Sequence, residues 1–251
     1  MRAATGARLS LRAFLMAVLL PWALPLPADS GEAGYRLLEL EGFKVKWGEQ
    51  RLGAGANISY AFADRTLHFS DARNCGRLAP MSALAEPDLP FETLVRETEA
   101  AFRVWERAAN LSFYQVADVL DADIILGAQG QPRRRAFANV AYASDKPVAE
   151  DGVRVIEQSL VCLNPDQQWK VGFGGDQNVY DLRYTLVHEI GHAIGLDHPG
   201  PSGQVMGFRY TEAFPELQPG DLRGVRRLYG PATNDGQLAN NAEAPLGQSS
   251  L

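Results

Sequence analysis

The clearest pattern of apolar and polar positions lies between Pro90 and Asn110. Apolar or small residues recur there every three or four positions, and charged residues take the opposite face of the same helix. The inward face holds Leu94, Val95, Thr98, Ala101, Phe102, Trp105 and Ala109, and the outward face holds Glu92, Arg96, Glu97, Glu99, Arg103 and Glu106. This spacing predicts an amphipathic helix of roughly five turns whose aromatic side chains belong to the core.

Several shorter segments alternate apolar and polar residues, which is typical of half-buried strands. They are residues 44–47, 57–62, 111–116, 122–126, 136–143 and 153–163. A last helix is predicted from Leu217 to Gly230. Strands that alternate with helices across a long crossover favour a mainly parallel sheet. The Pro-, Asp- and Ala-rich segment from Asp64 to Asp88 predicts a loop, and the run from Tyr35 to Leu40 has no assigned role.

The two ends of the chain differ from its middle. Residues 1–28 resemble a secretory signal peptide, with arginines ahead of a short apolar run from Ala13 to Leu24. That run is too short to span a bilayer, so no stable membrane anchor is expected. Residues 231–251 are polar and aperiodic, which predicts a disordered tail. The folded domain is therefore expected at residues 35–230, in a protein secreted to the periplasm or the extracellular space.

Composition narrows the function classes only a little. The chain has 251 residues, of which 46% are hydrophobic, enough for the core of one domain. Its formal net charge of −6 argues against a nucleic-acid partner. The basic cluster Arg133-Arg134-Arg135 is expected to be a solvated loop. Two cysteines, Cys75 and Cys162, fit an exported protein with one disulfide. The protein is expected to be a monomer.

The candidate chemistry is concentrated between His188 and His198, a stretch that contains three of the four histidines in the chain. His188 and His192 are four residues apart, so on a helix they lie on one face and can bind the same zinc ion. Gly195 suits a left-handed helix end, after which the chain can turn back and supply His198 as a third ligand. Three protein ligands leave one zinc position open, which is the catalytic pattern.

Glu189 follows the first ligand and is predicted to be the general base that acts on water without binding the metal. A bare His-Glu-x-x-His motif recurs by chance on amphipathic helices. The longer pattern fixes five positions, and chance would produce it in roughly one chain of this length in 10^5.

With Met206 following at a short interval, these residues resemble the metzincin signature, in which a methionine turn lies beneath the metal. The interval is similar to that of the matrixins, which are the matrix metalloproteinases and their bacterial single-domain relatives (peptidase family M10, subfamily A). The segment from Ala101 to Trp105 resembles the first matrixin helix, and the segment from Ala122 to Leu126 resembles a central strand. The resemblance extends from about Trp47 to Gly230.

The resemblance implies an α/β (α+β) fold: a twisted, mainly parallel five-stranded sheet with an antiparallel edge strand, two long helices and a C-terminal helix. It implies a zinc endopeptidase with one catalytic Zn²⁺ and protein or peptide substrates. Calcium could bind the loop from Asn164 to Asp181 through its carbonyls and acids. The family's second zinc site needs further histidines, and only His68 lies outside the motif. That site is expected to be absent.

The resemblance also suggests where substrate lies. An endopeptidase must hold its peptide extended, and adding the peptide to an exposed sheet edge does this with backbone hydrogen bonds. The segment from Ala136 to Ala143 resembles the edge strand beside the family's cleft. Ala138, Asn139 and Val140 are therefore predicted to bind substrate, and Tyr210 is predicted to line the specificity pocket.

Three alternatives stay open on the sequence alone. Asn74-Cys75-Gly76-Arg77 faintly resembles the cysteine switch of matrixin propeptides, although it follows the strand that the switch precedes in the family; a Cys75–Cys162 disulfide is predicted instead. A zinc-containing module that binds proteins without cutting them would need neither Glu189 nor an open metal position. A metal-dependent hydrolase of small molecules would not need Gly195, His198 and Met206 together.

Overall fold

The computed structural model describes residues 34–201 and 203–233. The predicted signal peptide lies outside the described residues, as does the predicted tail from residue 234 onward. Pro231, at the start of that tail, forms an isolated bridge with Ala109. Within the described part of the chain, no helix is both long enough and apolar enough to cross a membrane.

Five strands form the centre of one sheet, in the order β7 (Leu111–Gln115), β4 (Ala56–Phe62), β8 (Ile124–Gln129), β10 (Val153–Leu163) and β9 (Ala136–Tyr142). The first four are parallel to their neighbours, whereas β9 is antiparallel to β10. Among the described residues β9 pairs only with β10, so it lies at an edge. The predicted parallel sheet with an antiparallel edge strand is confirmed.

Short strands enlarge this sheet. They are β2 (Glu39–Leu40), β3 (Phe43–Lys46), β5 (Leu67–His68) and β6 (Arg77–Ala79). With them the sheet has nine strands within the described residues, instead of the predicted five. The predicted loop from Asp64 to Asp88 is also wrong in part, because it contains β5, β6 and a 3₁₀ helix at Met81–Leu84. The predicted strand at residues 44–47 corresponds to β3, whereas β2, β5 and β6 have only two or three residues each. Strands that short show no alternating pattern, so the sequence did not indicate these three.

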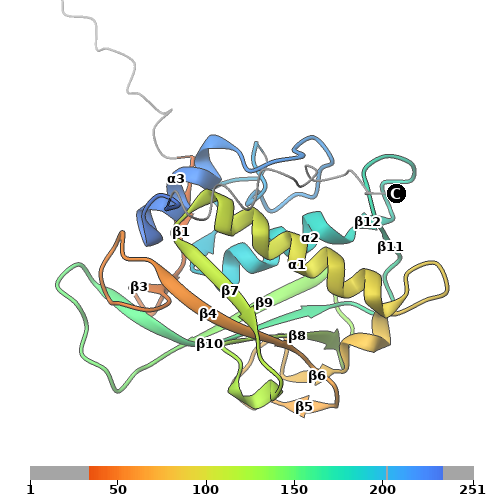
Figure 1. The fold of residues 1–251 in the computed structure, drawn as a ribbon, viewed down its shortest axis with the longest axis horizontal. Coiled ribbons are helices and arrows are strands. Elements are labelled where there is room, and N and C mark those ends of the chain that lie inside the picture. Colours follow the sequence, from red (N-terminus) through yellow and green to blue (C-terminus); the bar gives the residue numbers. More distant parts are fainter. Residues whose placement is uncertain (1–33, 202, 234–251) are drawn as a thin grey trace, which may run out of the picture. The chain divides into compact units, whose positions relative to one another are not determined.

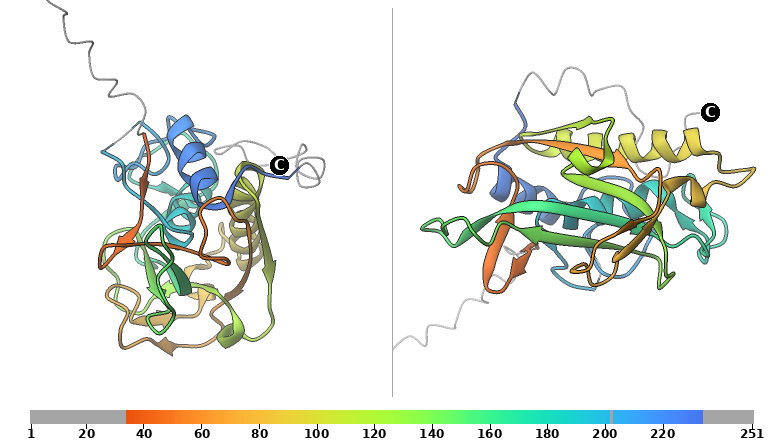
Figure 2. Two further views of the ribbon diagram at one scale, coloured as in Figure 1. Left: turned by 90° about the vertical axis from the view of Figure 1, so that its left-hand side faces the viewer. Right: turned by 90° about the horizontal axis from the view of Figure 1, so that it is seen from below.

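In the described part of the chain, helices α1 (Phe91–Ala108), α2 (Leu182–Ala193) and α3 (Pro219–Tyr229) lie on one side of the sheet (Figures 1 and 2). Two tryptophans hold α2 in place. Trp105 of α1 is fully buried and donates from Nε1 to the carbonyl of Val187 at 3.0 Å. Trp47 donates from Nε1 to the carbonyl of Ala193 at 2.9 Å. Because both acceptors belong to α2, that helix is anchored near its middle and at its C-terminal end.

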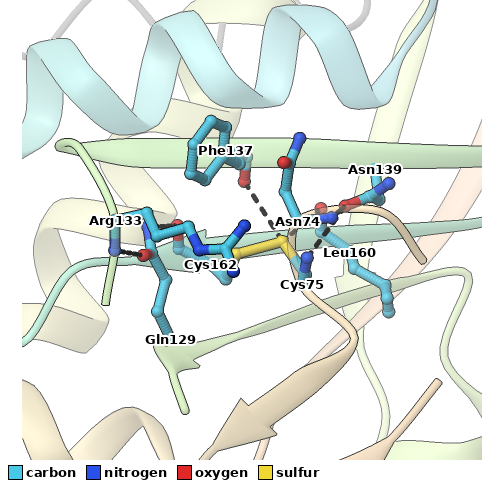
Figure 3. Close-up of a disulfide and its surroundings, with 8 residues drawn as sticks. All are labelled: Asn74, Cys75, Gln129, Arg133, Phe137, Asn139, Leu160 and Cys162. Atoms are coloured by element: carbon cyan, nitrogen blue, oxygen red, sulfur yellow. Dashed lines mark hydrogen bonds between the residues drawn. A yellow bond between two sulfur atoms is a disulfide. The ribbon is translucent and has the colours of Figure 1, made fainter. Parts of the chain in front are cut away.

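The other face of the sheet carries the disulfide. Cys75 and Cys162 are joined as predicted, with 5.9 Å between their Cα atoms (Figure 3). Both are fully buried and pack with Leu78, Ile125 and Leu160 in a second apolar cluster. The bond ties the segment before β6 to β10, the strand that pairs with β9. The loop that carries Cys75 therefore lies beside the edge strand.

Candidate active site

Helix α2 supplies the first two histidines. Its N-cap residue is Asp181, whose side chain accepts a hydrogen bond from the Tyr184 N–H at 2.6 Å and so caps the first turn. Nearly every residue from Leu182 to Ala193 is buried, so the helix passes through the core. His188 and His192 lie on the same face, and their ring centroids are 4.9 Å apart.

The chain reverses after α2 because Gly195 takes a left-handed conformation with φ of +100°. A Cβ at this position would also overlap the Val45 carbonyl oxygen. Both the backbone conformation and the lack of space therefore require glycine. Beyond the turn, β13 (Leu196–Asp197) pairs antiparallel with β1 (Arg36–Leu37). The run from Tyr35 to Leu40, which had no assigned role, thus braces the segment that delivers His198.

The three histidines converge on one point. The Nε2 atom of His198 lies 3.0 Å from that of His188 and 3.1 Å from that of His192. A zinc ion with Zn–N bonds of about 2.0–2.1 Å needs its nitrogens roughly 3.3 Å apart, so the spacing fits tetrahedral coordination. Among the described residues, no other group of three or more His, Cys, Asp or Glu side chains comes close enough to share a metal.

Backbone carbonyls orient these rings. The Nδ1 atom of His188 lies 2.7 Å from the Val205 oxygen, and that of His192 lies 2.8 Å from the Leu196 oxygen. Each Nδ1 therefore carries the proton, which leaves the Nε2 lone pair for a metal. Burial lowers the pKa of His192 to about 4 and also lowers the pKa values of His188 and His198. The rings are thus neutral near pH 7, as metal ligands must be.

Glu189 points from α2 toward the edge strand. Its side chain accepts a hydrogen bond from the Ala138 N–H, and burial raises the pKa of its carboxyl to about 7. The positive charge of Arg135 and the Ala138 hydrogen bond lower that pKa, but by less than burial raises it. A carboxylate with a pKa near neutral is suited to accept and return a proton.

A cavity of about 600 Å³ opens over the histidines and Glu189. Its wall includes Leu38, Leu40, Arg134, Arg135, Gln167, Tyr180, Phe208 and the consecutive β9 residues from Ala136 to Val140. The register of β9 on β10 shows which backbone groups face the cavity. Asn164 N–H bonds the Arg135 carbonyl at 2.9 Å, so Phe137 and Asn139 also bond to β10. Ala136, Ala138 and Val140 consequently direct their N–H and C=O groups to the free edge.

The other predicted substrate residues lie differently. The Asn139 side chain is engaged on the far face, where its Oδ1 accepts from the backbone N–H groups of Asn74 and Cys75 at 3.0 and 2.9 Å (Figure 3). Tyr210 lies behind the cavity wall, with its ring centroid 5.0 Å from that of Tyr180. A direct part for Asn139 or Tyr210 in binding substrate stays a prediction.

Met206 packs against α2 at Gly191, and its role as the floor beneath a metal stays a prediction. It is 2% exposed, and a Cβ on Gly191 of α2 would overlap its sulfur. Asp221 of α3, a residue that the sequence did not single out, holds this turn. Its carboxylate accepts from the N–H groups of Val205 and Met206, each at 3.0 Å. Asp221 is fully buried. An acid in the first turn of the predicted last helix was the only sequence signal for such a role.

The loop considered for calcium is held by internal contacts. Strands β11 (Trp169–Lys170) and β12 (Tyr180–Asp181) pair within it. The Lys170 Nζ donates to the carbonyls of Gly174 and Asp176 at 2.5 and 3.2 Å and pairs with Glu212 at 2.6 Å. An ammonium group thus occupies oxygen ligands of this loop, and calcium binding there stays a prediction.

Comparisons with known proteins agree with this geometry. The matrixin model of the M10 peptidases matches residues 81–230. The metalloendoproteinase 5-MMP of Arabidopsis thaliana is 28% identical over 149 residues, which cover 53% of this chain and 39% of that protein. The interstitial collagenase of Sus scrofa is 29% identical over 156 residues, covering 59% and 30%. Stromelysin-3 of Homo sapiens is 31% identical over 146 residues, covering 54% and 27%. The chain thus spans about two-fifths or less of the length of these relatives.

Proposed function

The chain belongs to the matrixin family of M10 peptidases, and from this premise we propose that it is a secreted zinc metalloendopeptidase. One observation carries the proposal: the Nε2 atom of His198 lies 3.0 Å from that of His188 and 3.1 Å from that of His192, and all three histidines line an open cavity together with Glu189. A structural zinc site has four protein ligands and is closed, whereas three ligands facing a cavity leave room for water and substrate.

Zinc held by His188, His192 and His198 would polarise the peptide carbonyl and lower the pKa of water toward ~7. Glu189 accepts the proton of the attacking water and then gives it to the amine nitrogen as the C–N bond breaks. Burial raises the pKa of the Glu189 carboxyl, which favours uptake of that proton. The Ala138 N–H keeps the carboxylate in position.

We propose that the peptide binds as an added strand on β9. The outward N–H of Val140 and the outward carbonyls of Ala136 and Ala138 are the matching groups for such a ladder. Tyr180 and Phe208 line the cavity, so they contact substrate side chains, with Tyr210 supporting Tyr180 from behind.

Secretion is part of the proposal. We assign residues 1–28 to a signal peptide, 35–230 to the catalytic domain and 231–251 to a polar tail. A disulfide buried beside the edge strand supports an oxidising compartment such as the periplasm or the extracellular space. We expect the protein to act as a monomer.

The test is cleavage of casein and of a peptide library by the purified protein. Cleavage should stop when a zinc chelator is added and return when zinc is restored. A protein that binds one zinc but cuts no peptide would be the alternative, a non-catalytic zinc module that binds proteins. Cleavage that persists without metal would contradict the assigned centre.

A further inference from the structure

The loop between β8 and β9 holds three consecutive arginines, but they do not share one environment. Arg133 and Arg134 are exposed, whereas Arg135 is half-buried. Hydrogen bonds hold the loop to neighbouring segments at each of the three arginines. The Arg133 N–H donates to Gln129 Oε1 at 2.6 Å (Figure 3), and Asn164 donates to the carbonyls of Arg134 and Arg135 at 2.5 and 2.9 Å. The expectation of a solvated loop therefore does not describe Arg135.

Two tyrosines set the position of the Arg135 side chain. Its Cζ atom lies over the rings of Tyr180 and Tyr210, 5.0 Å from each centroid. Tyr210 is itself fixed, because its hydroxyl accepts from the Asp181 N–H at 2.7 Å and donates to Glu212 at 2.9 Å. The guanidinium is thus held by cation–π contacts to rings that do not depend on bound substrate.

These contacts use the charge of Arg135 but none of its N–H donors. Within residues 34–201 and 203–233, its side chain has no hydrogen-bond acceptor and no carboxylate in an ion pair, and its Nε is buried without a partner. A guanidinium has five donors in a planar fork that matches a carboxylate. The Nε–H of Arg135 is the donor that is buried without a partner, and a buried unpaired donor is costly unless a ligand accepts from it.

Arg135 lines the same cavity as Glu189 and the three histidines. It also lies directly before Ala136, the first residue of the strand proposed to pair with substrate. A peptide on β9 therefore passes the Arg135 guanidinium within a few residues of the bond that is cut. We propose that Arg135 binds a carboxylate of the peptide and makes the enzyme selective for an acidic group near the scissile bond. This inference rests on the proposed function.

The experiment compares the wild-type protein with Arg135→Gln and with Arg133→Gln as matched control. Arg133 is in the same loop and loses the same charge, but it is exposed and is not part of the cavity wall. Substrates are quenched fluorescent peptides that differ only by Glu or Gln at one of the four positions on each side of the scissile bond. Further pairs end in a free carboxylate or an amide, which separates an acidic side chain from a chain terminus as the source.

Wild type should prefer the carboxylate member of one pair by roughly 10- to 100-fold in kcat/KM, mainly through KM, as charge-assisted hydrogen bonds allow. Arg135→Gln should lose this preference, so that the ratio of the two kcat/KM values falls toward one, and Arg133→Gln should keep it. Equal ratios in wild type and Arg135→Gln at every position would overturn the inference, since a purely structural arginine would slow both members alike.

Binding of the same labelled peptides, followed by fluorescence anisotropy, needs no turnover. If wild type cuts no peptide, the proposed function fails, but a carboxylate preference in binding that Arg135→Gln removes still supports the inference, and its absence refutes it. Thermal melting of all three proteins checks that Arg135→Gln is folded.

Discussion

Replacing Asp221 with Ala should weaken metal binding although Asp221 touches no metal ligand. Its carboxylate accepts the N–H groups of Val205, Met206 and Gln218 at 3.0, 3.0 and 2.9 Å. The Val205 carbonyl in turn lies 2.7 Å from His188 Nδ1. Asp221 therefore positions the peptide unit that orients the first ligand.

The magnitude follows from the donors left behind. Val205 and Met206 are 0% and 2% exposed, so their N–H groups would lose their acceptor away from water. Each buried unsatisfied donor costs about 1–3 kcal/mol, so Asp221→Ala should lower the free energy of unfolding by about 3–5 kcal/mol. Loss of an outer contact of a metal ligand should weaken zinc binding by roughly 10- to 100-fold. Asp221→Asn keeps one acceptor oxygen and should cost about half as much.

Urea unfolding gives the stability, and competition with a chelator of known zinc affinity gives the metal affinity. Glu216→Ala is the matched control, because it removes an exposed carboxylate just before α3. If Asp221→Ala behaved like this control in both measurements, the link from α3 to His188 would be disproved.

Four further predictions concern other parts of the molecule. Glu189→Gln should retain zinc by metal analysis while losing roughly 10²- to 10⁴-fold in turnover, and loss of the metal would contradict its role as a base. Val140→Pro removes a donor that faces the cavity, so kcat/KM should fall in a folded, zinc-loaded protein; unchanged cleavage would exclude pairing through that N–H. Burial lowers the pKa of Lys46 from 10.5 to about 8, so the unfolded chain binds more protons between these values and stability rises with pH. Measured by urea unfolding, the free energy of unfolding of wild type minus that of Lys46→Met should rise by about 3 kcal/mol between pH 7.5 and 11. A difference that stays constant with pH would refute this. Reducing the Cys75–Cys162 bond should cost about 2–4 kcal/mol of stability, and thiol titration of the unreduced protein should find no free thiol.

Local spacing in the sequence determined the metal centre and much of the fold. Two histidines four residues apart share a face of any helix, and Gly195 permits the left-handed turn that follows, so both features can be recognised from local sequence. The long strands and α1 were predictable for the same reason. The spacing of their apolar residues along the chain indicates a strand or a helix without knowledge of the fold. With two cysteines there was only one possible intramolecular disulfide.

Tertiary structure decided the surroundings of that centre. Asp221 meets the Met206 turn from another helix, and Arg135 lies over two tyrosines that come from separate segments. Neither contact has a fixed spacing in the sequence, because each depends on how whole elements pack. The same holds for the choice of Tyr180 over Tyr210 at the cavity wall and for the backbone groups of β9 that face it. A strand pattern shows which side chains alternate, but only the partner strand determines which amides remain unpaired.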